Sequence, residues 1–286
     1  MKKLVTSLVA AGVIAASAVG LSACGGNQLV VYTEAGFAPF EYLDGNSIVG
    51  VDVDIMNMVG EKLGREVVFE NVAFDTIVDA VSAGRLTNVG AAGLSITEDR
   101  LEKVDFSIPY YTASLYVIYR VGDEDAPVIS QSTTENGEVI YWDSLAGKNI
   151  GIQGGTTADL FLSDEIAEGG TLGGTNTRKT DYDSLAVAVN DIGQTTAAVI
   201  IDELPARTLV ANNSGLACLP LFYKGDTVEE DEAAVDQYAI AVTKGQTELL
   251  EAINEVLQSL IDDVDSDGNN GIDRLVMQHL DLATSD

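Results

Sequence analysis

The segment GAAGLSITEDR (residues 90–100) gives the first indication of the fold and of a binding site. Apolar and small residues from 89 to 94 predict a buried strand, and Thr97 then stands where it can cap a short helix. Backbone N–H groups at a helix N-terminus attract anions, and the guanidinium group of Arg100 matches a carboxylate with two parallel hydrogen bonds. Together with the hydroxyl group of Ser95, these groups predict a carboxylate-binding corner. The alternative is an exposed helix on which Arg100 pairs with a neighbouring acidic residue.

Strands and helices alternate on both sides of this segment. Apolar residues at helical spacing predict helices at 51–63 and 75–83, each followed by glycine, and the strands around them predict a mostly parallel sheet. After a polar stretch at 122–137 the alternation restarts, so we expect two α/β units with ligands at the carboxyl ends of their strands. The remaining predicted elements are strands at 29–33, 67–70, 114–120, 149–152, 197–201 and 238–243, and helices at 157–167, 182–189, 204–210 and 247–260.

The second unit contains two further candidate binding corners. The sequence GIQGGTT (151–157) leads from a strand through two glycines into a helix that begins with threonines, which predicts either an anion site or a tight turn. It lacks the lysine of a phosphate-binding P-loop. The strand at 197–201 leads into Asp202, whose carboxylate either accepts hydrogen bonds from an ammonium group or caps the next helix.

The N-terminus has the pattern of a lipoprotein signal peptide. Two lysines precede an apolar run, and the small residues Ser22 and Ala23 stand directly before Cys24. We expect a signal peptide at 1–23, lipidation (palmitate) of Cys24, and a short tether at 24–28 that holds the chain to a membrane. An uncleaved membrane helix is the alternative. The mature protein is then extracytoplasmic, on the cell surface or in the periplasm.

The net charge excludes one class of partner. The chain has 45 acidic and 15 basic residues, and removal of residues 1–23, with their two lysines, leaves 13 basic residues and a formal charge of −32. Such a chain repels a phosphate backbone, so we expect no nucleic-acid partner. Cys218 has no disulfide partner once Cys24 is lipidated, and we expect it to be a small core residue.

No metal site and no cofactor are predicted. Asp263, Asp265 and Asp267 imitate the first half of a calcium-binding EF-hand loop, but Arg274 stands where that loop needs a glutamate. We therefore expect a polar turn between two helices, with calcium binding as the alternative. His279 is the only histidine in the sequence. A metal site with several histidine ligands is therefore excluded, and we expect no histidine-based catalytic triad.

From residue 29 to about residue 280 the sequence resembles the extracytoplasmic amino-acid-binding proteins of ABC importers, which have the type II periplasmic binding protein fold. The resemblance rests on an ordered series of motifs in addition to GLSITEDR. These are TEAGFAPFEY (33–42), GVDVDI (50–55), AFDTIVDAVSAG (73–84), VDFSIPYY (104–111), IGIQGGTT (150–157) and AAVIIDE (197–203).

The resemblance implies two α/β lobes that close on an amino acid. The first lobe would consist of residues 29–109 plus 239–286 and the second of residues 115–233. Hinge segments at 110–114 and 234–238 would join the lobes. The closed protein would deliver its ligand to an ABC permease and the ATPase of that permease, and we expect the protein to be a monomer.

The resemblance also implies which residues would bind each end of the ligand. Arg100 would bind the α-carboxylate with help from Ser95, the backbone near Gly93, and the amide and hydroxyl groups of Thr156 and Thr157. An ionic ligand that enters a dry cleft must exchange its hydration for such charge-assisted hydrogen bonds.

The other end of the ligand would meet acidic and aromatic residues. Asp202 would accept the α-ammonium group, and Phe37 and Phe74 would enclose the side chain, unless both rings are core residues. Glu34 and Gln153 would face the end of the side chain. A buried glutamate disfavours an acidic ligand, so a polar amino acid with a basic side chain is slightly favoured.

Two other functions use the same fold. An extracytoplasmic enzyme of the dehydratase type would use Glu34, Glu41 or Asp202 as acid or base. No nucleophile with an adjacent base is visible, so we expect no catalytic residues. A sensor input module is the second alternative, and it would need a following membrane helix and signalling module.

Overall fold

The computed structural model describes residues 27–131, 137–225 and 231–284. The predicted signal peptide, Cys24 and the first part of the tether lie outside these residues. Across the described ranges, no helix is both long enough and apolar enough to cross a bilayer.

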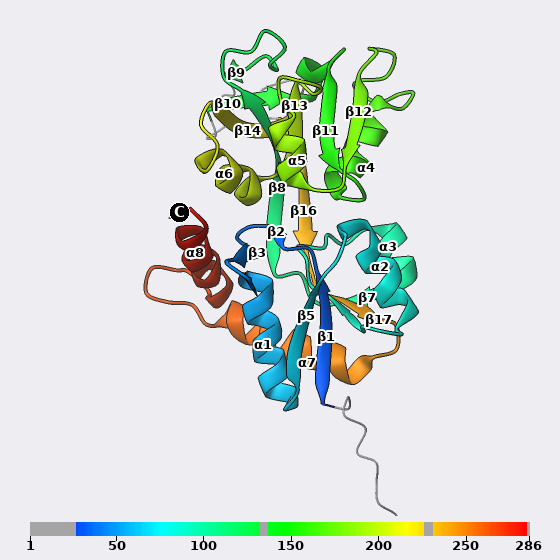
Figure 1. The fold of residues 1–286 in the computed structure, drawn as a ribbon, viewed down its shortest axis with the longest axis vertical. Helices are drawn as coiled ribbons and strands as arrows, with labels where there is room; N and C mark the ends of the chain where they lie inside the picture. The colour runs from blue at the N-terminus through cyan, green and yellow to red at the C-terminus, as the bar shows by residue number, and fades with distance from the viewer. Residues whose placement is uncertain (1–26, 132–136, 226–230, 285–286) are drawn as a thin grey trace, which may run out of the picture.

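The first half of the molecule is built on a five-stranded sheet (Figure 1). In the order β5-β1-β6-β17-β7, strand β1 (Gln28–Thr33) runs parallel to β5 (Glu66–Asn71) and β6 (Val89–Gly90), and β17 (Ala241–Thr243) is antiparallel to both β6 and β7 (Val104–Phe106). β7 therefore runs in the same direction as β5, β1 and β6, and β17 alone in this sheet is reversed, so the prediction of a mostly parallel sheet is confirmed. The helices of this half are α1 (Val51–Leu63), α2 (Phe74–Ala83), α3 (Glu98–Lys103), α7 (Thr247–Asp262) and α8 (Gly271–Ala283), and a small sheet holds β2 (Gly36–Phe37), β3 (Glu41–Asp44) and β4 (Ser47–Val49).

The second half is built on a larger mixed sheet. In order across the sheet, the strands are β12 (Arg178–Tyr182), β11 (Asn149–Gln153), β13 (Ala198–Asp202), β8 (Tyr111–Arg120), β14 (Leu216–Tyr223), β10 (Glu138–Tyr141) and β9 (Ser130–Gln131), with β15 (Glu232–Ala233) beside β14. The helices are α4 (Thr157–Ile166), α5 (Leu185–Asn190) and α6 (Glu203–Ala211), and a 3₁₀ turn spans Trp142–Leu145. Trp142 is buried in the core of this half.

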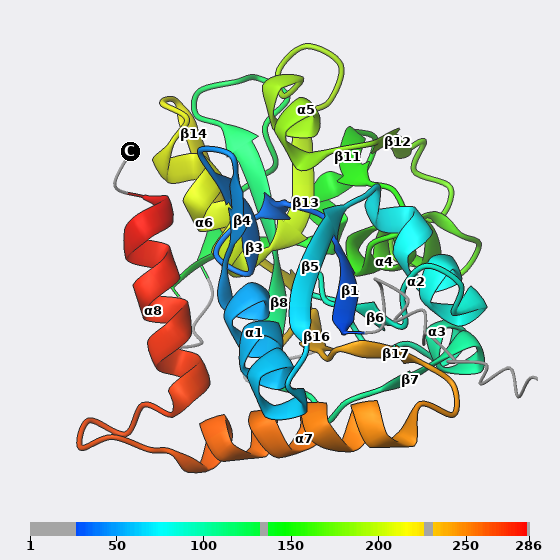
Figure 2. The same cartoon turned by 60° about the horizontal axis from the view of Figure 1, so that its bottom comes forward.

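Two strands run between the halves. The first four residues of β8 pair with β16 (Val235–Tyr238) in antiparallel register, from Ser114 opposite Val235 to Tyr111 opposite Tyr238. Figures 1 and 2 show this pair at the centre of the molecule, between the two sheets. The chain therefore crosses twice, close together, between the two halves.

Three predicted elements differ from the structure. The strand expected at 89–94 ends at Gly90, because the chain then turns and Gly93 adopts a φ of 52°, in the left-handed region that a side chain disfavours. The helix expected at 182–189 is the end of strand β12 followed by α5, and the polar sequence RKTDY of this edge strand hides its extended pattern. The strand expected at 238–243 is divided into β16 and β17.

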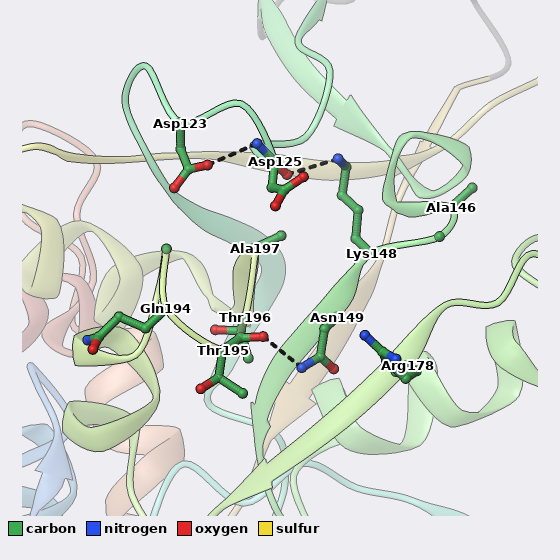
Figure 3. Close-up of a pocket in the computed structure, with 12 residues that line it drawn as sticks. Asp123, Asp125, Ala146, Lys148, Asn149, Arg178, Gln194, Thr195, Thr196 and Ala197 are labelled. Atoms are coloured by element: carbon green, nitrogen blue, oxygen red, sulfur yellow. Dashed lines mark hydrogen bonds between the residues drawn. The ribbon is translucent and has the colours of Figure 1, made fainter.

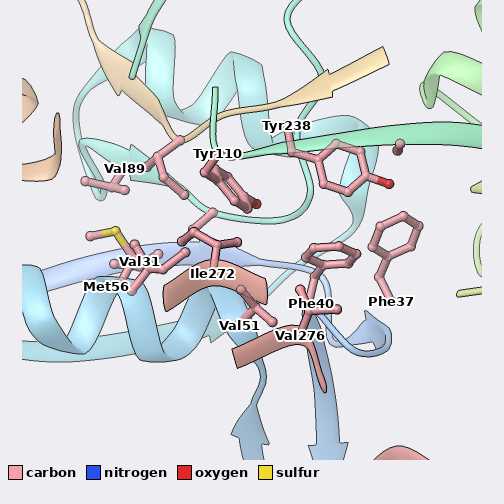
Figure 4. Packing of buried hydrophobic residues seen from close by; sticks show 14 of the residues in the cluster. Val31, Phe37, Phe40, Val51, Met56, Val89, Tyr110, Tyr238, Ile272 and Val276 are labelled. Atoms are coloured by element: carbon pink, nitrogen blue, oxygen red, sulfur yellow. The ribbon is translucent and has the colours of Figure 1, made fainter. Parts of the chain in front are cut away.

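A cluster of aromatic rings anchors the crossing strands in the first half (Figure 4). Tyr238 of β16 is fully buried, and its ring meets the edge of Phe40 with 5.0 Å between centroids. Phe40 in turn lies 5.0 Å from Tyr111 of β8, again edge to face. Such pairs add to the hydrophobic contribution of the buried rings. The core thus fixes the point at which both crossing strands leave the first half.

Candidate functional site

A small cavity lies between the two halves and is lined by all the expected ligand-binding residues except Arg100. Its volume is about 10 Å³, roughly the room that one water molecule needs. An amino acid fits there only after the walls move apart. The lining residues are Glu34, Phe37, Phe74, Gly93, Ser95, Gln153, Thr156, Thr157 and Asp202.

Arg100 lies beside this cavity and reaches from one half to the other. The hydroxyl oxygen of Thr97 caps α3 by accepting from the backbone N–H of Arg100, at 3.3 Å. The guanidinium group donates from Nη1 to the carbonyl of Ser95 at 2.7 Å and from Nη2 to the carbonyl of Gly155 at 2.9 Å, and it stacks 5.6 Å from the ring centre of Phe74. Among the described residues it forms no ion pair on its own helix, so the exposed-helix alternative is wrong.

The charge of Arg100 is expensive to bury. The side chain is 8% exposed. Burial lowers the pKa of Arg100 to about 10, although the negative charges of Asp236 and Asp202 act in the opposite direction. The group still carries its proton at neutral pH. Three of its five N–H donors remain after the two backbone bonds, so it can receive a carboxylate.

Asp202 ends β13 at the wall of the cavity. It precedes α6, but its side chain makes no capping hydrogen bond, so the capping alternative is wrong. Its Oδ1 atom is buried and has no hydrogen-bond partner among the described residues. Burial raises the pKa of Asp202 well above its usual value and the negative charge of Asp236 raises it further, while the nearby hydroxyl group of Tyr238, the backbone N–H of Asp202 and the charge of Arg100 lower it in part. A buried acceptor without a partner is suited to a cationic group.

Asp236 is the residue of this site that the sequence analysis missed. It lies on β16, and its Oδ2 atom accepts from the hydroxyl groups of Ser95 at 2.6 Å and Thr157 at 2.5 Å. Its Oδ1 atom is buried without a partner among the described residues. A signal was present, because alternate residues of a strand share a face and the neighbours two positions away, Ala234 and Tyr238, are buried.

Glu34 and Gln153 face each other from the two halves. Glu34 follows β1 and Gln153 ends β11, and both line the cavity. Burial raises the pKa of Glu34, while hydrogen bonds from Gln153 and from the backbone of Gly36 lower it in part. Phe37 and Phe74 provide the aromatic walls of the same cavity, and Phe37 also packs against the core.

A pair of buried carboxyl groups lies behind Gly93. Asp52 accepts from the backbone N–H of Gly93 at 3.0 Å and from the hydroxyl group of Tyr110 at 2.5 Å. Burial raises the pKa of Asp52 to about 6, and burial together with Asp52 raises the pKa of Glu41 well above its usual value. These groups hold the Gly93 peptide in place. Glu41 does not line the cavity, so it has no access to a ligand there.

The acidic turn between α7 and α8 is organised by Arg274. Its Nη1 atom donates to the carbonyls of Asp263 and Asn269, each at 2.9 Å, and its Nη2 atom contacts the carboxylate of Asp263. The guanidinium group thus lies among the oxygens that a calcium ion would need, as expected for a polar turn. Across the residues that the structure describes, no cluster of three metal-ligating side chains is found.

Helix α8 contacts both halves. Near its middle, the buried imidazole of His279 lies 3.1 Å from the carboxylate of Asp54 in α1 and 3.2 Å from the hydroxyl group of Tyr42 in β3. At its end, Asn212 beside α6 donates to the carbonyl of Ala283 at 3.1 Å. The helix is therefore attached to the first half and reaches the second.

A roomier cavity lies at the far end of the second sheet (Figure 3). Its volume is about 280 Å³, and its polar lining includes Asp123, Lys148, Asn149 and Arg178. Lys148 is engaged with the carbonyl of Asp125 at 2.9 Å. This cavity lies where β11 and β12 begin, whereas ligands of such sheets bind where the strands end. None of the residues expected to bind a ligand lines it.

Known proteins of similar sequence identify the family of this chain. Residues 29–267 match the family of bacterial extracellular solute-binding proteins, family 3. A putative ABC transporter arginine-binding protein 2 of Escherichia coli is 30% identical over 262 residues, 91% of this chain and 93% of the relative. A probable histidine-binding protein of Neisseria gonorrhoeae is 27% identical over 267 residues, 87% of this chain and 89% of the relative.

A solved structure agrees with the fold. An amino acid ABC transporter substrate-binding protein of Streptococcus pneumoniae, bound to L-arginine, superposes with a TM-score of 0.71 at 27% identity, covering 90% of this chain and 96% of that one. The architecture is thus the two-lobed type II periplasmic binding protein fold. The family consists of solute-binding proteins rather than enzymes. The chain belongs to the bacterial extracellular solute-binding proteins of family 3.

Proposed function

We propose that this protein is the solute-binding component of an ABC importer and captures a polar amino acid, with a basic side chain favoured. The observation that carries the proposal is the cavity between the lobes. It brings together, from both lobes, two carboxyl groups, an amide and two aromatic rings, and Arg100, with three free donors, contacts its lining residues Ser95 and Phe74. The permease of the importer and its ATPase would then receive the amino acid.

The ligand backbone would bind between opposite charges. The α-carboxylate would meet the remaining donors of Arg100. The Gly93 N–H donates to Asp52 and the Thr156 hydroxyl group donates to the carbonyl of Gln153, so either would have to exchange its partner to bind the ligand. The α-ammonium group would meet the unpartnered Oδ1 atom of Asp202. Each charged end then exchanges water for charge-assisted hydrogen bonds, and an unpaired end would cost several kcal/mol.

The side chain of the ligand would lie between Phe37 and Phe74 and end at Glu34 and Gln153. A carboxylate with a raised pKa gains most from a cationic partner, which favours an arginine-like or lysine-like side chain. The names of the E. coli and S. pneumoniae relatives agree with this preference, and the N. gonorrhoeae name extends it to histidine. An enzymatic role on this fold is not favoured, because the chain belongs to a family of solute-binding proteins.

Binding would proceed by closure of two lobes, residues 29–109 with 239–286 and residues 115–233, about hinges at 110–114 and 234–238. The bond from Arg100 to the carbonyl of Gly155 joins the lobes, and a ligand held by residues of both lobes stabilises the closed arrangement by its differential affinity. The permease would recognise this arrangement.

The protein would act as a monomer held to the outside of the membrane through lipidated Cys24. The sequence pattern at residues 1–24 supports the anchor, and the extracellular family supports the location outside the membrane. Replacement of Cys24 by alanine should release the protein into the soluble fraction. Retention of the Cys24→Ala protein in the membrane fraction would contradict the anchor.

A thermal-shift screen of the twenty common amino acids, ornithine and cystine tests the proposed function. A ligand at 100 times its dissociation constant adds about 2.7 kcal/mol to the free energy of unfolding. We expect the largest shift from a basic amino acid, with a smaller radius of gyration in solution scattering when it is added. No shift with any of these compounds would refute the proposed function.

A further inference from the structure

Asp236 uses the hydroxyl donors that were assigned to the ligand. Its Oδ2 atom accepts from Ser95 at 2.6 Å and from Thr157 at 2.5 Å. A hydroxyl group has a single proton to donate, so neither group can donate to Asp236 and to a ligand carboxylate at the same time. The positive charge of Arg100 also acts on Asp236. The contacts of Asp236 are therefore those of the expected ligand carboxylate.

We propose that Asp236 is an internal carboxylate that competes with the ligand α-carboxylate for the hydroxyl groups of Ser95 and Thr157 and thereby sets the affinity of the site. This inference rests on the proposed function. When the ligand binds, these hydroxyl groups exchange the carboxylate of Asp236 for that of the ligand. The binding free energy is therefore less favourable than the number of new hydrogen bonds suggests.

The same contacts hold the lobes together. Ser95 follows β6 in the first lobe, Thr157 begins α4 in the second, and Asp236 lies on the crossing strand β16. A single carboxylate oxygen therefore links hydroxyl groups from opposite sides of the cavity. Loss of this link should favour the open arrangement and leave both hydroxyl groups available to a ligand.

A double-mutant cycle measured by calorimetry with L-arginine tests the competition. The variants are Asp236→Ala, Ser95→Ala and the double variant. We expect Ser95→Ala to weaken binding about tenfold more in the Asp236→Ala background than in the original chain, a coupling of about 1.4 kcal/mol. A purely electrostatic effect of the Asp236 charge on the ligand predicts no such coupling, because the side chain of Ser95 carries no charge. Glu232→Ala, which removes an exposed carboxylate of β15, is the control for the change in net charge.

Two results would overturn the inference. Equal losses from Ser95→Ala in both backgrounds would show that Asp236 and the ligand do not share the hydroxyl group. Loss of detectable arginine binding in folded Asp236→Ala would make Asp236 a direct partner of a cationic ligand group. If Asp236→Ala does not fold, Asp236→Asn takes its place, because it keeps the shape and removes the charge.

Solution scattering tests the link between the lobes without any added amino acid. We expect a larger radius of gyration for Asp236→Ala than for the original chain and for Glu232→Ala, since the link between the lobes is lost. Equal radii would refute the linking role. A chain that binds none of the screened amino acids would refute the proposed function, and the scattering comparison would still decide whether Asp236 holds the lobes together.

Discussion

Replacement of Arg100 by alanine should abolish tight amino-acid binding and leave the fold in place. Two of the five N–H groups of Arg100 donate to the carbonyls of Ser95 and Gly155, which leaves three for a carboxylate. A hydrogen bond to a charged group contributes about 1.5–3 kcal/mol. Loss of two such bonds in a buried site costs on the order of 3–5 kcal/mol, which raises the dissociation constant by roughly two to nearly four powers of ten.

Titration calorimetry with L-arginine, on protein whose fold is checked by circular dichroism, measures this loss. Arg100→Lys should fall between the original chain and Arg100→Ala, because an ammonium group keeps the charge but lacks the planar pair of donors. Arg207→Ala is a matched control. The guanidinium group of Arg207 also stacks on a ring, 5.2 Å from the centre of Tyr116, but its hydrogen bonds go to Glu203 and Tyr116, neither of which lines the cavity.

The effect on stability should be small. Burial lowers the pKa of Arg100 to about 10, so removal of the side chain relieves a desolvation cost. It also leaves Asp202 and Asp236 without their countercharge, and the two effects oppose each other. A folded Arg100→Ala protein whose dissociation constant for arginine stays within about threefold of the original would refute the assignment of Arg100 to the ligand carboxylate.

Three further predictions concern other carboxylates and the acidic turn. Asp202→Asn should weaken all α-amino acids alike, whereas Glu34→Gln should change which side chain is preferred; competition assays that show equal losses for every ligand with Glu34→Gln would contradict the second role. Burial raises the pKa of Asp52 from 3.8 to about 6, so its contribution to stability is full below pH 3.8 and is lost as the pH rises through about 6, by up to about 3 kcal/mol. The Tm should therefore be higher at pH 5 than at pH 7.5, and Asp52→Asn should reduce that difference; an unchanged difference would assign it to other groups. Calcium should leave the Tm unchanged because Arg274 lies among the oxygens of Asp263 and its neighbours, and a rise with calcium that a chelator reverses would show a metal site.

The elements with local signals at both ends were predicted well from the sequence. Helix α1 spans Val51–Leu63, as predicted, because its apolar spacing is regular and Gly64 ends it in the left-handed conformation with a φ of 65°. Helix α2 begins one residue earlier than predicted and ends before Gly84 in the same way. The strand order across the two sheets could not be predicted, because pairing such as that of β8 with β13 and β14 joins residues far apart in the chain.

In the candidate site, too, residues with a local sequence signal were predicted, and a residue placed by long-range contacts was not. The motifs around Arg100 and Asp202 could be recognised because each charged residue follows a buried strand or begins a helix. The contact of Asp236 with hydroxyl groups 141 and 79 positions away depends on how the crossing strand meets both lobes. Its alternation with apolar Ala234 and Tyr238 indicates that Asp236 shares an inward face, but the local sequence does not indicate which groups it meets there.

Helix α8 offers a way to observe the protein at work without touching its ligand. Its middle is fixed to the first lobe through His279, while the carbonyl of Ala283 at its end accepts from Asn212 of the second lobe. Any motion that parts the lobes must alter this distant contact. A fluorescent reporter pair with one dye near Ala283 and the other on α6 would therefore turn each capture event into an optical signal, which would make the protein a reagentless sensor for the solute that it carries.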